Sequence, residues 1–434
     1  MLVQFNKICV LGLGYIGLPT ASTFATNGLQ VIGVDVNPQV VDTLLDGGLH
    51  IQEPGLRTLV KAAIGSGNLT ICKTPEIADA FIIAVPTPFS PDKRANLSFV
   101  VAAAEAILPY LQPGNLVVLE STSPPRTTVD VVAPILERSG LIAGVNFHLV
   151  YSPERVLPGQ ILRELIENAR VIGGVDRASA EAGRDLYSVF VKGEFILTDA
   201  TTAEMVKLME NTYRDVNIAI ANEFSRLADR FSIDVWGAIE IANHHPRVEI
   251  LRPGPGVGGH CIGVDPWFLV EAAPDITHLI RAAREVNDSQ PAFVVDLICR
   301  ALGTVPHERL SGKKIAILGL AYKPDVDDLR ESPAMEVVRQ LTDLGALITA
   351  YEPLKEKIRI TDAECYPKLR EAIQDTDLIA LLVAHTPLLQ LDPFQIVSQT
   401  RTRIVVDCVN GWEGEHWINA GFRYYRLGAP ASSF

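Results

Sequence analysis

The sequence predicts an α/β protein in which two doubly wound, Rossmann-like domains are joined by a central all-helical domain with one long helix. Three observations predict it. Strand and helix patterns alternate from the N-terminus, residues 201–231 contain no glycine or proline, and the opening pattern returns after residue 313. A chain of 434 residues is too long for a single hydrophobic core. We place the domain boundaries at residues 1–200, 201–300 and 301–434.

The first domain is predicted as a series of strand–helix–strand units. Strand-like apolar runs occupy residues 7–12, 30–37, 80–88, 115–123 and 147–156, and a glycine turn with a following helix occupies residues 12–28. Alternation of this kind is typical of a parallel sheet with helices on both faces.

The central region is predicted to contain a helix over residues 201–231, with Thr201 or Thr202 as its cap. A long helix between two doubly wound domains is also a natural dimer surface, so we expect a homodimer through the central helices. The apolar residues at helical spacing are Met205, Leu208, Val216, Ile220, Phe224 and Leu227.

The last third of the chain repeats the opening pattern. Residues 313–326 resemble residues 6–19, residues 376–387 resemble residues 78–88, and residues 403–411 resemble residues 115–123. The same alignment places Glu352 in the position of Asp35. These matches indicate an internal duplication and therefore a second doubly wound domain.

The charge and the apolar runs exclude some classes of partner. The net charge of −13 argues against non-specific nucleic-acid binding, although local arginine and lysine can still bind an anionic substrate. The N-terminus leads directly into a strand without the pattern of a signal peptide. No apolar run approaches the ~20 residues that a membrane helix needs, so we expect no membrane insertion.

The cysteines are scattered and form no CxxC pair. This disfavours a zinc site or a disulfide scaffold, and it fits a reducing cytoplasm. We expect no metal, and we expect Cys9 and Cys408 to be buried within strands. The six cysteines are Cys9, Cys72, Cys261, Cys299, Cys365 and Cys408.

The turn Gly12-Leu13-Gly14-Tyr15-Ile16-Gly17 has the pattern GxGxxG. It follows a predicted strand, opens a helix, and precedes Asp35 at the end of the next strand, which together predict a dinucleotide site. Asp35 is expected to accept hydrogen bonds from the adenosine ribose and to repel a ribose phosphate, which favours NAD over NADP. The alternative is a tight turn that binds no ligand.

The second copy of this turn has lost the diphosphate-binding pattern. Gly319 is kept, but Ala321 takes the middle position and Lys323 brings a positive charge. This suits a nucleotide-linked substrate better than a second NAD. The alternative is a decayed structural repeat.

A second glycine-rich loop, GPGVGGHCIGVDPW, runs from Gly254 to Trp267. Its glycines are expected to let the backbone pass close to a ligand and to leave Cys261 accessible, with Asp265 near enough to move a proton or orient water. The alternative is a flexible loop with an incidental cysteine.

Further polar candidates lie on the long helix and at strand ends. Lys207, Asn211 and Arg214 share one helix face, although a solvated face is the ordinary explanation of such spacing. Ligands of open α/β sheets bind at the carboxyl ends of strands, where Pro86-Thr87, Ser121-Thr122 and Glu154-Arg155 stand.

NAD together with an accessible thiol suggests a particular chemistry. An alcohol can be oxidised to an aldehyde, and a cysteine thiolate can add to the aldehyde as a thiohemiacetal. A second hydride loss gives a thioester, which water hydrolyses to the acid.

With these motifs in place, the chain resembles the nucleotide-sugar dehydrogenases, the family of UDP-glucose and GDP-mannose 6-dehydrogenases. The resemblance covers residues 7 to about 412, and it is greatest to the branch that acts on UDP-N-acetylhexosamines. UDP-N-acetyl-D-mannosamine is the first substrate that it implies and UDP-N-acetyl-D-glucosamine the second. The motifs are GLGYIGLP, IAVPTP, ESTSPP, SPERVLPGQ, AEMVKLMENTYRDVNIAIANE, PGPGVGGHCIGVDPW and GLAYKPDVDDLRESP.

The resemblance also implies roles for individual residues. Cys261 is the nucleophile, Lys207 the acid/base beside Asn211, Asp265 and Thr122 position water, and Glu154 assists thioester hydrolysis. The implied NAD contacts are Gly12, Gly14, Tyr15, Ile16, Gly17, Asp35, Thr87, Thr122 and Arg330. The implied UDP-sugar contacts are Arg155, Val156, Lys207, Asn211, Arg214, His245, Arg247, Gly254, Tyr322 and Lys323, with the region of His245 and Arg247 reaching a neighbouring subunit.

The sequence departs from the UDP-glucose pattern in two places. His260 precedes Cys261 and Gly263-Val264 follows, where the UDP-glucose enzymes have serine before the cysteine and a lysine after it, which argues against UDP-glucose. Val409 and Asn410 stand where relatives carry a basic residue that holds the substrate. Either the sugar site differs here, or the charge comes from elsewhere; the candidates are Arg401, Arg403 and Arg423.

Two other classes of function stay open. A two-electron NAD-dependent hydroxyacid dehydrogenase shares the NAD turn and a helical second domain, but it has no use for Cys261. A non-catalytic nucleotide-binding regulator shares the two nucleotide domains, but it needs neither Lys207 nor Cys261.

Overall fold

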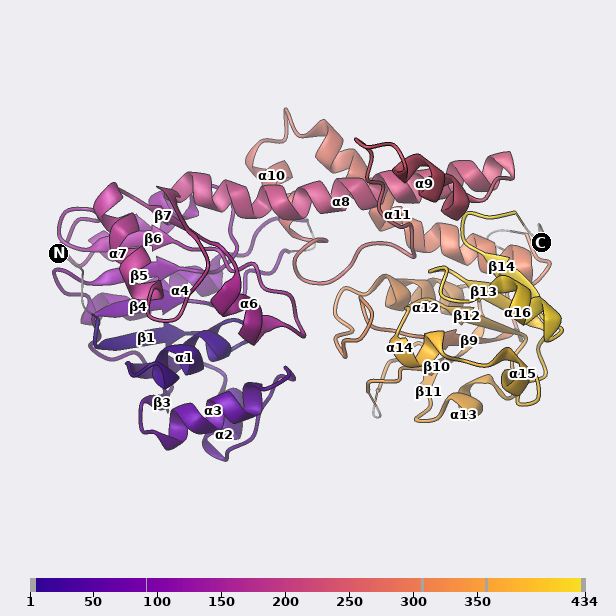
Figure 1. Cartoon of the computed structure of the whole chain (residues 1–434), viewed down its shortest axis with the longest axis horizontal. Coiled ribbons are helices and arrows are strands. Elements are labelled where there is room, and N and C mark those ends of the chain that lie inside the picture. The colour runs from indigo at the N-terminus through magenta and orange to yellow at the C-terminus, as the bar shows by residue number, and fades with distance from the viewer. Residues whose placement is uncertain (1–4, 91, 306–307, 356–357, 431–434) are drawn as a thin grey trace. The chain divides into compact units, whose positions relative to one another are not determined.

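The computed structural model describes residues 5–90, 92–305, 308–355 and 358–430. The chain divides into two compact units. The N-terminal unit comprises the residues up to Glu210 together with Trp267–Pro274, and the C-terminal unit comprises Asn211–Pro266 and the residues from Asp275 onward. Each unit contains one sheet covered by helices, which confirms the predicted fold class (Figure 1). The three-part division at residues 200 and 300 stays a prediction.

The first sheet has eight strands in the order β3-β2-β1-β4-β5-β6-β7-β8. Every neighbouring pair is parallel except β6 and β7, which run antiparallel. The parallel pairing expected for β1, β2, β4, β5 and β6 is confirmed. The reversed pair includes β7, for which the sequence pattern predicted no strand; the chain returns from the carboxyl edge of β6 without crossing the sheet. The strands are β1 (Lys7–Leu11), β2 (Gln30–Val34), β3 (Leu69–Cys72), β4 (Ala80–Ile83), β5 (Leu116–Leu119), β6 (His148–Tyr151), β7 (Arg170–Gly174) and β8 (Phe195–Asp199).

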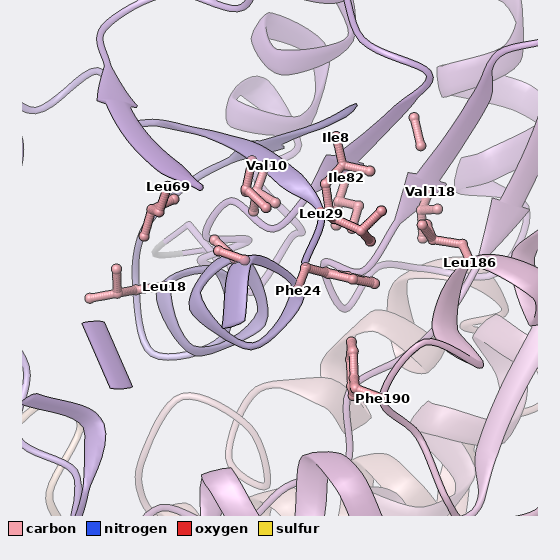
Figure 2. Close-up of a cluster of buried hydrophobic side chains, with 14 of the residues drawn as sticks. Ile8, Val10, Leu18, Phe24, Leu29, Leu69, Ile82, Val118, Leu186 and Phe190 are labelled. Atoms are coloured by element: carbon pink, nitrogen blue, oxygen red, sulfur yellow. The ribbon is translucent and has the colours of Figure 1, made fainter. Parts of the chain in front are cut away.

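Alternate residues of these strands build two separate cores. One face packs under the first group of helices: α1 (Gly17–Thr26), α2 (Pro38–Leu45), α3 (Leu56–Gly65), α6 (Ile161–Glu167) and α7 (Arg177–Tyr187). Figure 2 shows part of this core, with Phe24 of α1 beside Phe190. The other face packs under α4 (Ser98–Ile107), η1 (Leu108–Tyr110), η2 (Thr128–Val132) and α5 (Ala133–Glu137). Both faces are covered, so the strands are apolar throughout rather than alternating.

The second sheet is entirely parallel, in the order β11-β10-β9-β12-β13-β14. This repeats the order of the first six strands, which confirms the duplication inferred from sequence. The strands are β9 (Lys314–Leu318), β10 (Leu347–Tyr351), β11 (Glu364–Cys365), β12 (Leu378–Leu381), β13 (Ile404–Asp407) and β14 (Arg423–Arg426).

Helices cover both faces of the second sheet as well. One face packs against α11 (His278–Ala301) and α12 (Pro333–Asp343). The opposite face packs against α13 (Leu369–Ile373), α14 (Thr386–Leu389), α15 (Pro393–Ile396) and α16 (Gly414–Asn419). As expected, Cys9 is buried within β1; Cys408 is also buried, but it follows the last residue of β13, and Cys261 is exposed.

The long helix α8 runs from Ala200 to Phe231 and confirms the predicted helix. Its start is held by Asp199, whose carboxylate accepts from the Thr202 backbone N–H at 2.9 Å and from its hydroxyl at 2.6 Å. Asp199 therefore caps the helix in place of the expected Thr201 or Thr202. The remaining helices are α9 (Val235–Asn243) and α10 (Asp265–Ala272).

Much of the apolar surface of α8 is exposed in the single chain. The exposed residues recur every three, four or seven positions, so they form one stripe along the helix. They are Met205, Met209, Tyr213, Ile220, Phe224, Leu227 and Phe231. Within the described part of the chain, no helix is both long enough and apolar enough to cross a membrane.

Candidate active site

The first glycine turn combines two tightly packed glycines with one that faces open space. A Cβ on Gly12, whose φ is +93°, would lie 2.5 Å from the Ala84 carbonyl oxygen, and one on Gly17 would lie 1.8 Å from the Gly12 oxygen. At Gly14, in contrast, a Cβ would meet nothing within 4 Å. The turn is thus tightly packed at Gly12 and Gly17 and has open space at Gly14, which fits the close approach of a dinucleotide diphosphate.

Asp35 joins this turn to the end of β2. Its carboxylate accepts from the Leu13 backbone N–H at 3.0 Å and from the Asn37 N–H at 2.9 Å. The side chain is half-exposed, so each oxygen keeps a lone pair for a ligand hydroxyl. Tyr15 and Ile16 are half-buried in the same turn.

The ends of β4 and β5 are tied together beside this turn. The Thr87 hydroxyl donates to the Thr122 carbonyl oxygen at 2.6 Å, and the Ser121 hydroxyl donates to the Val85 oxygen at 2.7 Å. The structure therefore brings Thr87 and Thr122 together, as their strand-end positions predict. Glu204 of α8 anchors the following segment by accepting from the Thr128 N–H at 2.7 Å.

The segment after β6 places three predicted residues in different surroundings. Glu154 is largely buried and forms an ion pair with Arg170 of β7 at 2.9 Å. The Arg155 guanidinium binds Glu210 at 2.8 Å and also donates to the Ala169 carbonyl. Val156 packs against the core under α1. Of these three, only Glu154 is a candidate acid or base.

The second glycine loop presents Cys261 immediately before α10. The Cys261 carbonyl accepts from the Val264 and Asp265 N–H groups at 3.0 and 2.9 Å, which fixes the turn. Asp265 begins α10 and is only 1% exposed, and Asn211 of α8 donates to its carboxylate at 2.5 Å. The structure thus gathers Cys261, Asp265 and Asn211 around one turn.

Four glycines of this loop, Gly254, Gly256, Gly258 and Gly259, were expected to let the backbone pass close to a ligand, but most of them serve protein packing. A Cβ on Gly258 would lie 2.0 Å from the Glu331 oxygen, and one on Gly259 would lie 2.7 Å from the Tyr322 ring. Gly256 is similarly close to Pro333, at 3.1 Å. Gly254 alone has open space around it and can face a ligand.

A buried chain of amides holds the loop, and sequence reasoning missed it. The Gly254 N–H donates to Asn222 of α8 at 2.9 Å, and Asn222 donates to Asn287 of α11 at 2.9 Å. Asn287 in turn donates to the Asp215 carboxylate at 2.8 Å, which also pairs with the buried Arg284. The available signal was the position of Asn222 directly after the apolar run of residues 218–221.

The second copy of the nucleotide turn has a fully buried carboxylate. Glu352 accepts from the Leu320 and Ala321 N–H groups at 2.8 and 3.1 Å. His385 accepts the Asp325 N–H at Nδ1, so its Nε2 carries the proton and donates to Glu352 at 3.1 Å. Burial opposes the charge on Glu352, but these hydrogen bonds prevail and lower its pKa. The turn is therefore rigid.

Tyr322 and Lys323 extend from that rigid turn. The Tyr322 N–H donates to the Asp328 oxygen at 3.1 Å, and its ring packs on Gly259 of the cysteine loop. Both side chains are half-exposed. The structure thus brings the second nucleotide turn to the cysteine loop within the C-terminal unit.

The remaining predicted residues lie on helices or in exposed segments. Lys207 is 8% exposed, so the helix face that it shares with Asn211 and Arg214 is not solvated at Lys207. Arg214, His245 and Arg247 are exposed. Arg330 is exposed and pairs with Asp328 through two nitrogens at 2.8 and 2.7 Å.

The arginines expected to replace the missing basic residue lie at the wrong edge of the sheet. Arg401 and Arg403 precede β13 and Arg423 begins β14, so all three stand at the amino ends of strands. Arg401 is engaged by Asp377 at 2.9 Å there. Ligands bind at the opposite, carboxyl edge, where Asn410 lies.

Arg426 brings a positive charge to the carboxyl edge instead. It ends β14, level with Asp407 of β13, and its Nη1 donates to the Asn410 side-chain oxygen at 2.8 Å. Asp234 lies 2.8 Å from its other terminal nitrogen. Sequence patterns missed Arg426 because its place follows only from knowing that β14 pairs with β13.

Comparisons with known proteins cover the whole chain. The UDP-glucose/GDP-mannose dehydrogenase family matches through its NAD binding domain at residues 6–191, its central domain at residues 201–289 and its UDP binding domain at residues 316–414. A UDP-N-acetyl-D-mannosamine dehydrogenase of Methanococcus maripaludis is 47% identical over 439 residues, which cover 99% of this chain and 98% of the relative.

Two further comparisons bear on the substrate and the fold. An NDP-N-acetyl-D-galactosaminuronic acid dehydrogenase of Ralstonia solanacearum is 45% identical, covering 95% of this chain and 98% of its own. The solved structure of a UDP-D-ManNAc dehydrogenase from Pyrococcus horikoshii superposes with a TM-score of 0.89 at 40% identity, covering 97% and 99% of the two chains.

The glycine turn yields a test that separates packing from binding. We expect Gly17→Ala to lower the melting temperature, because its Cβ collides with backbone and overpacking costs about 1–3 kcal/mol or more. We expect Gly14→Ala to melt like the wild type but to bind NADH about tenfold more weakly, a loss of about 1.4 kcal/mol. Thermal melts and NADH fluorescence titrations measure both effects, and tight NADH binding by Gly14→Ala would contradict the assignment.

Proposed function

Because the chain belongs to the UDP-glucose/GDP-mannose dehydrogenase family, whose first domain binds NAD, we propose that it oxidises UDP-N-acetyl-D-mannosamine to the uronic acid. The primary alcohol at the sugar's C6 is converted to a carboxylate, and two NAD and one water are consumed for each sugar. The observation that carries this proposal is the exposed Cys261, held at the start of α10 beside Asp265 and Asn211.

The residues around the first glycine turn suit NAD. Gly14 allows the diphosphate to approach the start of α1, where the helix dipole favours an anion. Asp35 accepts from the ribose hydroxyls, and its charge disfavours a ribose phosphate. Tyr15, Ile16, Thr87 and Thr122 complete the site, with Arg330 as a further proposed contact. When bound, NAD accepts the hydride that is removed in each of the two oxidations.

Cys261 makes the second oxidation possible. Its thiolate adds to the aldehyde carbon and forms a thiohemiacetal, which loses a hydride to become a thioester. Lys207 is proposed to take the alcohol proton and to stabilise the developing oxyanion, with Asn211 beside it. Water then breaks the carbon–sulfur bond, with Asp265 and Thr122 positioning the water and Glu154 accepting its proton.

The C-terminal unit is proposed to hold the nucleotide. Lys323 and Arg426 bring positive charge to the carboxyl edge of the second sheet, and Tyr322 offers a ring beside Gly259. Gly254 leaves room for the ligand. Because Glu352 is buried against His385, the acid in the position of Asp35 is not accessible here, and this turn does not suit a second NAD. The other proposed substrate contacts are Arg155, Val156, Lys207, Asn211, Arg214, His245 and Arg247.

We also propose a homodimer formed through the central helices. Monomeric proteins rarely expose an apolar patch as extended as the stripe on α8, and we propose that a second copy of the chain covers it. The exposed segment around His245 and Arg247 would then serve the neighbouring subunit. An exposed thiol at Cys261 further suits a reducing cytoplasm.

The stoichiometry of NADH tests the thioester route. We expect about two NADH per limiting UDP-N-acetyl-D-mannosamine, because each sugar undergoes two hydride losses. Cys261→Ala should abolish acid formation, whereas Cys365→Ala, a half-buried cysteine on β11, should leave it unchanged. One NADH per sugar in the wild type would contradict the role of Cys261.

The same assay decides the sugar. UDP-N-acetyl-D-glucosamine is the second candidate, and UDP-N-acetyl-D-galactosamine belongs in the series because a 45% identical relative is named for that uronic acid. UDP-glucose serves as the control that lacks the N-acetyl group. We expect the highest kcat/KM for UDP-N-acetyl-D-mannosamine. A higher value for another UDP-sugar would make that sugar the substrate instead.

Arg426 is expected to bind the substrate. Arg426→Ala should raise the KM for the UDP-sugar about tenfold or more, because a charged hydrogen bond is worth about 1.5–3 kcal/mol. The matched control is Arg403→Ala at the opposite edge of the sheet, which should leave KM unchanged. Initial-rate kinetics measure both, and equal KM values for the two variants would exclude Arg426 from the site.

The dimer proposal is tested by placing a charge on the α8 stripe. Phe224→Glu should convert the protein to a monomer, because an unpaired charge at the centre of an apolar interface is costly. Phe394→Glu on α15 changes another exposed phenylalanine and should leave the mass unchanged. Light scattering after gel filtration measures the mass. If the Phe224→Glu variant is still a dimer, the interface does not include this part of α8.

A further inference from the structure

A buried arginine lies between two carboxylates at the carboxyl edge of the first sheet. Arg170 Nη2 binds Glu120 Oε1 at 2.6 Å, and Arg170 Nη1 binds Glu154 Oε2 at 2.9 Å. Its Nε donates to the Ser152 hydroxyl at 3.0 Å. The side chains of Arg170, Glu120 and Glu154 are 4%, 0% and 8% exposed. This cluster stands directly behind the proposed base of thioester hydrolysis.

The reversed strand β7 is what puts the arginine there. Val150 and Tyr151 of β6 pair with Gly174 and Gly173 of β7 in antiparallel register. Continuing this register places Arg170, the first residue of β7, level with Glu154. In a parallel pairing the first residue of β7 would lie at the opposite, amino edge of the sheet.

The cluster contains two buried carboxylates, Glu120 and Glu154, but only one guanidinium to pair with them. The Tyr187 hydroxyl of α7 donates to Glu120 Oε1 at 2.5 Å, and the Tyr187 ring lies 3.7 Å from the Arg170 guanidinium. The charged and titratable groups that face Glu120 are therefore Arg170, Glu154 and Tyr187. One guanidinium shared by two buried carboxylates cannot fully balance both.

Burial and the neighbouring carboxylate weaken the acidity of Glu120. Burial raises the pKa of Glu120 to about 7, Arg170 opposes the rise, and the charge of Glu154 adds to it. Because the pKa is raised, Glu120 gains a proton as the pH falls through neutrality. Arg170 then forms an ion pair with Glu154 alone.

We propose that Arg170 and Glu120 are positioning residues for the hydrolysis of the Cys261 thioester. Arg170 fixes the Glu154 carboxylate at one oxygen, while the Arg155 N–H donates to the other at 2.7 Å. Ionised Glu120 shares the positive charge of Arg170 with Glu154, so Arg170 does not pair with Glu154 alone while Glu154 accepts a proton from water. The inference rests on the proposed function, in which Glu154 is that base.

The step itself needs no oxidant. The water oxygen forms a bond to the thioester carbon, one water proton passes to Glu154, and the carbon–sulfur bond breaks with Cys261 leaving as a thiolate. The second water proton is released when the product acid ionises. Glu120 and Arg170 do not exchange atoms with the substrate; they act only through Glu154.

The test follows the covalent adduct on Cys261 in Glu120→Gln. We expect Glu120→Gln to form NADH in the first turnover at the wild-type rate, to accumulate the thioester, and to turn over about tenfold more slowly. The loss is smaller than the hundredfold or more expected when a general base is removed altogether. Rapid acid quench with intact-protein mass spectrometry measures the adduct, and stopped-flow absorbance measures NADH.

The pH profile separates positioning from a merely structural role. Wild-type hydrolysis should slow as the pH falls below about 7, the titration of Glu120. Glu120→Gln should not show this slowing at low pH, because glutamine does not titrate. Arg170→Lys keeps the positive charge but cannot bind both carboxylates, so it should accumulate adduct and still show the slowing at low pH. It also serves as the second variant if Glu120→Gln does not fold.

Glu154→Gln distinguishes failure of the inference from failure of the proposed function. If Glu154→Gln does not accumulate adduct, Glu154 is not the base and the proposed hydrolysis step is wrong. If Glu154→Gln accumulates adduct while Glu120→Gln has the wild-type rate and pH profile, only the inference about Glu120 is overturned. An equal slowing of the NADH burst and of hydrolysis in Glu120→Gln would likewise overturn it.

Discussion

Both doubly wound domains depend on one interaction: a carboxylate at the end of the second strand accepts the backbone N–H groups of the turn after the first strand. The turns are tight, because a Cβ on Gly12 would lie 2.5 Å from the Ala84 oxygen and one on Gly319 would lie 2.6 Å from Val383 Cβ. Such a turn leaves N–H groups without helical partners, so an acceptor must be supplied. Asp35 supplies it in one domain and Glu352 in the other.

The two copies of this interaction differ in what they leave exposed. Asp35 is half-exposed and lies in the same turn as Gly14, which has open space around it, so the Asp35 oxygens remain accessible. Glu352 is buried and locked by His385, which makes the second turn a rigid support for Tyr322 and Lys323. The same packing solution thus gives a dinucleotide site in one copy and a platform for side chains in the other.

The antiparallel direction of β7 places its first residue at the carboxyl edge of the sheet, where a parallel strand would place its last residue. It carries Arg170 to the carboxyl edge of β6, where the arginine holds Glu154 and Glu120 in a buried cluster. In the C-terminal unit, the cysteine loop is held by Asn222 and by backbone packing against Glu331. Each arrangement fixes a segment that carries a proposed catalytic residue: Glu154 in the first and Cys261 in the second.

The sequence by itself determined the fold class, the duplication, the compact glycine turn before Asp35 and the accessibility of Cys261, because strand periodicity, turn glycines and strand-end position are local properties of the chain. Only the tertiary structure decided that Asp199 caps α8, that Gly258 and Gly259 pack on Glu331 and Tyr322, and that Arg426 rather than Arg401, Arg403 or Arg423 reaches Asn410. It also decided that β7 runs antiparallel and so places Arg170 beside Glu154. These outcomes depend on strand direction and on contacts between residues far apart in the chain, and no local pattern encodes either of them.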